Sequence, residues 1–235
     1  MNKRLIVLRR AQVLYDTKWK TFLRRAWLFR HIPFVEFAFG AGSMAVGGVY
    51  KDSDFDVIVG ARRGRIWSAR FFAVIAFGIF GWRRKKLTHN EAAADKICLN
   101  HFVTERSFAF SPPRSASWRT LYANLVPLFG APETIQAFWD ANADWMGERR
   151  IYVDDLRHRH RTPSRAKLIF ERMLSGRVGK IAECVLKKVQ VAFIRRNLRS
   201  PEIGYAPRIV YTDDELEFHP DTRRNYRRTH TPEGI

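Results

Sequence analysis

Apolar positions recur along this chain with two different periods, and these periods predict where helices and strands lie. Residues 11–32 carry Trp19 and other large apolar side chains at helical spacing, with Lys and Arg largely on the opposite side, and Pro33 ends this helix. The apolar stretch 66–82 predicts a second helix that is buried along most of its length. Shorter apolar runs predict buried strands at 34–40, 55–60 and 96–104.

The pattern becomes mainly helical after Pro112-Pro113. Helices are predicted at 118–126, 132–145 and 166–197, and a short strand is predicted at 208–211. The longest helix is amphipathic, and Gly176 and Gly179 are candidate breaks in it. Its apolar stripe includes Val178, Ile181, Val185, Val189 and Phe193. Near the end of the chain, His219-Pro220-Asp221 is a compact polar cluster that predicts a turn, with a fold-back onto a site as the alternative.

Candidate chemistry is concentrated in GAGSMAVGGVYKDSDFDVIVG, residues 40–60. Gly42 and Ser43 end a strand and open a helix, where free backbone N–H groups and a hydroxyl can hold a phosphate. After ten intervening residues, Asp54 and Asp56 alternate with apolar residues at the start of a strand. The period of two places both carboxylates on one face, where they repel each other unless a cation bridges them. Oxygen ligands of this kind, together with substrate phosphates, are those that Mg²⁺ prefers.

This stretch resembles the signature of the polymerase-beta-like nucleotidyltransferase superfamily: Gly-Ser, about ten residues, then Asp-apolar-Asp-apolar. Ala41 departs from it slightly, because a larger apolar residue is usual there. The rest of the chain resembles a group of predicted bacterial nucleotidyltransferases, through IPFVEFAFGAGS, KICLNHFVT, YANLVPLFG, FWDANADW and LEFHP. The resemblance implies an α+β fold with a small mixed sheet flanked by helices. It implies a catalytic core at 1–110 and a mainly helical region at 111–235.

Members of this superfamily usually supply a third carboxylate from a later strand. Here the predicted strand 96–104 has Asn100 at its centre, and alternation would place Cys98, Asn100 and Phe102 on one face. Asn100 can bind a metal through its carbonyl oxygen but cannot act as a base; a hydrogen-bonded core amide is the alternative. The flanking Asp95 and Glu105 are candidate substitutes.

Arginines that follow the predicted metal strand are candidates for binding the triphosphate. Arg65 and Arg70 are the two that we assign to the substrate, because a guanidinium can contact a phosphate through two hydrogen bonds.

The amino-acid composition indicates which classes of binding partner fit this chain. The chain has 42 Lys and Arg against 23 Asp and Glu, a formal net charge of +19, which predicts a polyanionic partner. Two scattered cysteines indicate neither a disulfide framework nor a zinc site, and the seven histidines show no metal-binding spacing. The most hydrophobic stretch, 71–82, is too short to span a bilayer and lacks the polar face of an interfacial helix. We therefore expect a cytoplasmic protein without an integral membrane segment.

The sequence thus predicts an Mg²⁺- or Mn²⁺-dependent nucleotidyltransferase that moves a nucleoside monophosphate from an NTP to a hydroxyl acceptor. Asp54 and Asp56 would hold the metal, with Asn100 as a third catalytic group. Gly42, Ser43, Arg65 and Arg70 would hold the nucleotide. Nucleic acid is slightly favoured over a small molecule as acceptor because of the charge. The alternative is a non-catalytic nucleotide- or nucleic-acid-binding protein that retains the fold.

Overall fold

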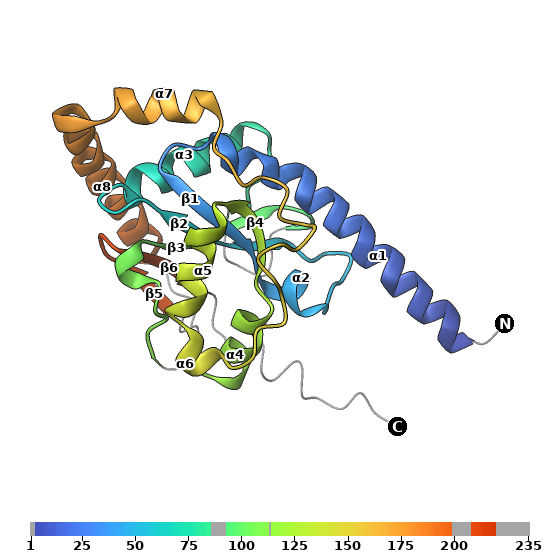
Figure 1. Ribbon diagram of the computed structural model, residues 1–235. Helices are drawn as coiled ribbons and strands as arrows, with labels where there is room; N and C mark the ends of the chain where they lie inside the picture. The colour runs from blue at the N-terminus through green and yellow to red at the C-terminus, as the bar shows by residue number, and fades with distance from the viewer. Residues whose placement is uncertain (1–2, 86–92, 113, 199–207, 220–235) are drawn as a thin grey trace.

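A six-stranded mixed sheet forms the centre of the molecule, with helices on both of its faces (Figure 1). The computed structural model describes residues 3–85, 93–112, 114–198 and 208–219. The strand order is β4-β1-β2-β3-β6-β5, and β2 and β3 form the one parallel pair. The strands are β1 Val35–Gly40, β2 Phe55–Ala61, β3 Ile97–Val103, β4 Val126–Gly130, β5 Arg208–Tyr211 and β6 Glu215–His219. The α+β architecture with a mixed sheet is confirmed.

Eight α-helices are present in the described residues, and none of them has both the length and the hydrophobicity that a membrane span requires. Two short 3₁₀ helices follow α1 and β3, at Trp27–His31 and Glu105–Ser107. The α-helices are α1 Lys3–Ala26, α2 Gly42–Val46, α3 Ile66–Ile79, α4 Ala116–Ala123, α5 Pro132–Asp140, α6 Ala143–Met146, α7 Arg165–Met173 and α8 Gly176–Leu198.

Each face of the sheet has its own core. The face that we call the α3 face is covered by α1, α3 and α8 and carries Phe55, Val57 and Phe102. The opposite face, the α5 face, is covered by α4, α5 and α6 and carries Phe39 and Ile58. Since residues alternate between faces along a strand, β2 directs Asp56 to the α5 face together with Ile58.

A β-bulge interrupts this alternation in β3. Asp56 of β2 pairs with Cys98, whereas Ile58, two residues on, pairs with His101, three residues on. The extra residue places Asn100 and His101 on the same face in succession. The predicted common face of Cys98, Asn100 and Phe102 is therefore wrong for Phe102, which packs in the core of the α3 face.

Two strands differ from the sequence predictions. The helix predicted at 118–126 ends at Ala123, and β4 begins at Val126. β4 is an edge strand, where Pro127 is tolerated because it need not donate to a neighbour on its outer side.

The turn predicted at His219 is instead the end of β6, and the two residues after it in the cluster lie outside the described residues. Three of the six strands thus come from beyond residue 110, and a domain boundary there stays a prediction.

The long C-terminal helix breaks at Gly176, as predicted, but presents an unexpected face to the core. Its apolar stripe is exposed; Ile181 and Phe193, for example, are 66% and 61% exposed. Polar residues share the inward side with other apolar ones: Gln190 donates to the Trp67 carbonyl (2.8 Å), and Ile194 is buried in the core. An amphipathic helix normally buries its apolar stripe, so this orientation leaves a large apolar surface in contact with solvent.

Glu183 of α8 caps the start of α3, and we expect its loss to weaken the packing of the two helices. Its carboxylate oxygens accept hydrogen bonds from the backbone N–H groups of Trp67 (2.8 Å) and Ser68 (2.9 Å). Glu183→Ala leaves these donors without their partner and should lower the free energy of unfolding by about 1–2 kcal/mol. The exposed Lys180→Ala on the same helix should change it by less than about 0.5 kcal/mol. Equal effects of the two substitutions in denaturant unfolding would contradict the capping role.

Candidate functional site

The two aspartates of the predicted metal motif lie together at the start of β2. Asp54 precedes the strand, Asp56 is its second residue, and Cys98 lies beside Asp56 on β3. One ligand atom from each of these three residues falls within 4.8 Å of the other two. We call Asp54, Asp56, Cys98 and the neighbouring Arg84 the carboxylate site. The sequence identified both aspartates, and the fold brings them together.

Asp56 is the electrostatically unusual member of the site. Burial, and secondarily the negative charge of Asp54, raise the pKa of the Asp56 carboxyl to about 7. Arg84 and a hydrogen bond with the Cys98 thiol act in the opposite direction. Burial and the two nearby carboxylates also raise the pKa of the Cys98 thiol well above its usual value. At neutral pH the thiol is therefore protonated and serves as a donor to Asp56.

Arg84 supplies the positive charge nearest to the aspartates. Its Nη1 lies 2.7 Å from Oδ2 of Asp54, and both side chains are largely buried. The backbone places it there, because the Arg84 N–H donates to the carbonyl of Ile97 (2.9 Å) as the chain returns from α3 to β3. The sequence motif did not include Arg84 among the residues of the site. The charge requirement of two adjacent carboxylates was the signal that could have identified Arg84.

Gly42 lies directly against Asp56. A Cβ atom at position 42 would be 2.1 Å from Oδ2 of Asp56, and Gly42 has a φ of +61°, which favours glycine. The close approach that this glycine permits is thus to a carboxylate of the same chain. Ser43 follows it in α2, half-buried, so the Gly-Ser turn and the carboxylates adjoin as the motif predicts.

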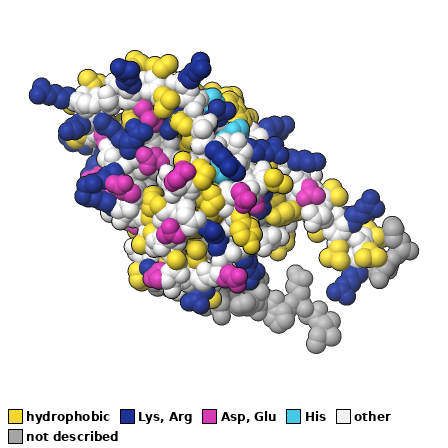
Figure 2. Space-filling view, in the orientation of Figure 1, with side chains coloured by type: hydrophobic (Ala, Val, Ile, Leu, Met, Phe, Trp, Pro, Cys, Tyr) yellow, Lys and Arg dark blue, Asp and Glu magenta, His cyan; other side chains and the backbone are white. Residues whose placement is uncertain are grey.

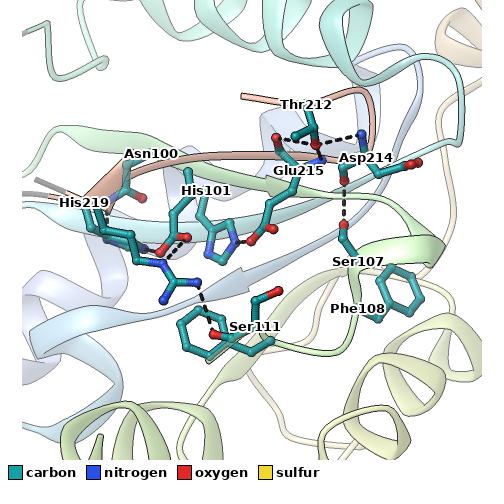
Figure 3. A network of polar contacts seen from close by, with 12 residues as sticks. Asn100, His101, Ser107, Phe108, Ser111, Thr212, Asp214, Glu215 and His219 are labelled. Carbon is teal, nitrogen blue, oxygen red and sulfur yellow. Dashed lines mark hydrogen bonds and ion pairs between the residues drawn. The ribbon is translucent and has the colours of Figure 1, made fainter. Parts of the chain in front are cut away.

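Asn100 shares the α5 face with Cys98, as the alternation predicts, and lies beyond it along β3. Cys98, and not Asn100, is the residue that pairs with Asp56 across the two strands. The amide nitrogen of Asn100 lies 3.4 Å from Nδ1 of His219 on β6 (Figure 3). The catalytic role predicted for Asn100 stays a prediction.

The two flanking acids do not replace Asn100. Asp95 forms an ion pair with Lys18 (2.9 Å), and Glu105 is exposed and lies 3.8 Å from Arg63. Within the described residues, the metal-ligand grouping around the aspartates therefore contains no third carboxylate.

Arg65 and Arg70 lie on the α3 face, across the sheet from the aspartates. Arg65 packs over the ring of Phe34 and against α8, and Arg70 donates to Oε1 of Gln190 (2.7 Å). Burial lowers the pKa of Arg70 to about 10. Their predicted contact with the nucleotide is not supported by this placement. After β2 the chain crosses to the α3 face, which a linear sequence pattern does not reveal.

Comparisons of this chain with protein-family models, with curated proteins and with solved structures find no match. The residues of the carboxylate site are therefore the basis for assigning a function.

The pKa of Asp56 predicts a pH dependence of stability for the metal-free protein. The folded state retains a proton up to about pH 7, whereas the unfolded chain releases it near pH 3.8. The free energy of unfolding should therefore fall as pH rises between these values, by up to about 1.4 kcal/mol per pH unit. Asp56→Asn should remove this part of the slope, and Asp52→Asn, in the exposed loop nearby, should not. Denaturant unfolding over this pH range with a chelator present measures the effect; identical slopes for wild type and Asp56→Asn would refute it.

Proposed function

We propose that the carboxylate site binds a divalent cation, Mg²⁺ or Mn²⁺, together with the triphosphate of an NTP, and that the chain is a nucleotidyltransferase. The observation that carries this proposal is that the Gly42-Ser43 turn lies against the pair of carboxylates. The pKa of one of them, Asp56, is raised, as expected for a buried carboxyl beside a second one. Two carboxylates in a largely buried volume fit a divalent cation, because it offsets a repulsion that Arg84 alone does not remove.

Each residue of the site has a distinct task in this proposal. Asp54 and Asp56 are the oxygen ligands, and Gly42 and Ser43 offer donors to the phosphates. The Cys98 thiol holds the Asp56 carboxylate in place through a hydrogen bond. Arg84 neutralises Asp54 while no cation is bound and shares that carboxylate when one is. Bound divalent cations supply charge neutralisation of the triphosphate and activation of the attacking hydroxyl.

The acceptor is a hydroxyl group of unidentified origin. The net charge of +19 favours a nucleic acid over a small molecule, since a polyanion gains most from positive potential. The NTP itself also benefits from that potential.

A second candidate function is nucleotide or nucleic-acid binding without catalysis. Cys98 favours it, because this protonated thiol stands beside Asp56, whereas the superfamily that the motif resembles usually places a third carboxylate near the first two. A carboxylate there can serve as a base for the attacking hydroxyl, and a protonated thiol cannot.

Calorimetric titration of the full chain with each of the four NTPs, with and without Mg²⁺, tests the site. We expect Mg²⁺-dependent binding that Asp54→Ala/Asp56→Ala weakens by about tenfold or more. Asp52→Ala removes an exposed carboxylate from the same loop and should bind like the wild type. Binding that does not respond to Asp54 and Asp56, or no binding, would refute the proposal. Release of pyrophosphate that depends on Asp54 would then separate the enzyme from the binding protein.

A further inference from the structure

A second cluster of metal-binding side chains lies on the α5 face, where β3 adjoins β6. We call it the histidine site: His101, Glu217 and His219. His101 pairs directly with Glu217 across the two strands, and His219 follows two residues later on the same face of β6. One ligand atom from each of the three side chains lies within 4.8 Å of the other two. The histidines are far apart in the sequence, so their spacing gave no sign of this cluster.

Four polar atoms of the histidine site are buried without hydrogen-bond partners among the described residues. His101 and Glu217 are 0% exposed. Neither ring nitrogen of His101 has a partner among the described residues, nor does Oε1 of Glu217 or Nε2 of His219. The nearest approaches, His101 Nε2 to Glu215 Oε1 and His219 Nε2 to Glu217 Oε1, are both 3.4 Å and lack hydrogen-bond geometry. Buried polar atoms normally have partners, so this concentration of unpaired nitrogen and oxygen atoms calls for a physical explanation.

We propose that His101, Glu217 and His219 bind a divalent transition-metal ion, for which Zn²⁺ is the best fit. Two imidazoles and one carboxylate are a ligand set that Zn²⁺ uses, and Mg²⁺ disfavours. In a tetrahedral zinc site with bonds of about 2.0–2.1 Å, the ligand atoms lie about 3.3 Å apart. The 3.4 Å between His219 Nε2 and Glu217 Oε1 matches that separation.

The surrounding residues are arranged as supports for these ligands. Arg208 Nε lies 2.5 Å from Oε2 of Glu217, which leaves Oε1 directed at the histidines. Glu215 faces Nε2 of His101, so Nδ1 of that ring can present its lone pair to the ion (Figure 3). Asn100 lies beside Nδ1 of His219. After a half-turn of the amide, its unpaired Oδ1 accepts that N–H and leaves Nε2 for the metal.

Cobalt substitution tests this site in the full chain. The metal-free protein is titrated with Co²⁺, whose visible absorption reports tetrahedral coordination, and Zn²⁺ affinity is measured by competition with a chromogenic chelator. We expect a tetrahedral Co²⁺ spectrum without a thiolate charge-transfer band. His219→Ala and Glu217→Gln should each weaken Zn²⁺ binding at least about tenfold. Asp54→Asn/Asp56→Asn and His160→Ala, a histidine outside the site, should leave it unchanged.

Several results would overturn the proposal. One is a folded wild-type protein that shows no tetrahedral Co²⁺ spectrum, which is decisive even if a variant fails to fold. Another is unchanged Zn²⁺ affinity in both His219→Ala and Glu217→Gln. A third is a spectrum with a thiolate band that disappears in Asp54→Asn/Asp56→Asn, since this would place the ion at the carboxylate site. The proposal does not depend on the proposed nucleotidyltransferase function.

A different observation, the exposed stripe of α7 and α8, carries a second inference. We call this surface the α7–α8 surface; nine large apolar side chains on it are exposed to solvent. They are Leu168, Ile169, Phe170, Met173, Val178, Ile181, Val185, Val189 and Phe193. Figure 2 shows hydrophobic and basic side chains next to one another over α7, at the top of the view. An apolar surface of this extent marks an interaction site.

The exposed charges on the α7–α8 surface are all positive within the described residues. Its two acids face inward: Glu171 accepts from the Phe34 N–H (2.7 Å), and Glu183 accepts from the start of α3. The exposed basic side chains are Arg165, Arg172, Arg177, Lys180, Lys188, Arg195 and Arg196. Apolar side chains bordered by Lys and Arg are the pattern of helices that lie in a membrane interface.

We infer that the α7–α8 surface docks on an anionic lipid bilayer. The apolar side chains would enter the boundary between headgroups and acyl chains, and the basic ones would contact lipid phosphates. A second copy of this chain fits less well, because it would bring two such basic surfaces together in a molecule of net charge +19. A nucleic acid offers phosphates to the basic side chains, but it offers no apolar environment for the seven aliphatic side chains of this surface.

Vesicle flotation of the full chain tests this surface. We expect binding to phosphatidylcholine vesicles that contain phosphatidylserine and at least about tenfold weaker binding to pure phosphatidylcholine. Ile181→Ser/Val185→Ser should reduce binding by about tenfold or more, because both side chains would lose their insertion into the bilayer. Val13→Ser, at an exposed apolar position of α1, should bind like the wild type. Equal binding by Ile181→Ser/Val185→Ser and wild type would overturn the inference. So would a wild-type dimer that this double substitution abolishes, since the occupant would then be a second copy.

Discussion

The repulsion between Asp54 and Asp56 is the constraint around which one end of the sheet is organised. The two carboxylates share a small, largely buried volume, and Asp56 responds with a pKa of about 7. Three neighbours make this tolerable: Arg84 pairs with Asp54, the Cys98 thiol donates to Asp56, and Gly42 leaves room for the Asp56 side chain. The arrangement remains short of positive charge, which is the physical reason for proposing a divalent cation there.

The bulge in β3 divides the polar residues of the α5 face into two groups. Before it, Cys98 lies beside Asp56 and completes the carboxylate site. After it, Asn100 and His101 turn to the same face and meet the acids and the histidine of β6 (Figure 3). Without the extra residue, His101 would point into the apolar core of the α3 face. A single irregularity thus separates an oxygen-rich cluster from a nitrogen-rich one, and the two suit different cations.

The orientation of α8 affects a different part of the molecule. Its inward side combines core residues such as Ile194 with two polar groups, Glu183, which caps α3, and Gln190, which is bonded to the backbone of Trp67. Burying these groups is acceptable because each has partners of good geometry. The consequence is that apolar and basic side chains share the outer surface. The orientation in which α8 is hydrogen-bonded to α3 therefore also creates the surface that we propose to bind lipid.

The sequence by itself determined the local features of this protein. Helical spacing, the break at Gly176, three of the strands in the first half and the adjacency of the Gly-Ser turn to Asp54 and Asp56 follow from near neighbours in the chain. Periodicity and turn chemistry act over a few residues, so they can be recognised without the fold.

Only the tertiary structure decided which groups meet. Arg84 approaches Asp54 because the chain returns from α3 beside β3. Arg65 and Arg70 lie away from the carboxylate site because α3 covers the other face of the sheet. Strand β6 was not predicted. Its two glutamates are typical of a polar surface segment, whereas in the fold they face a buried cluster. Register, the position of the bulge and the buried side of α8 depend on contacts between distant segments, and no local pattern encodes them.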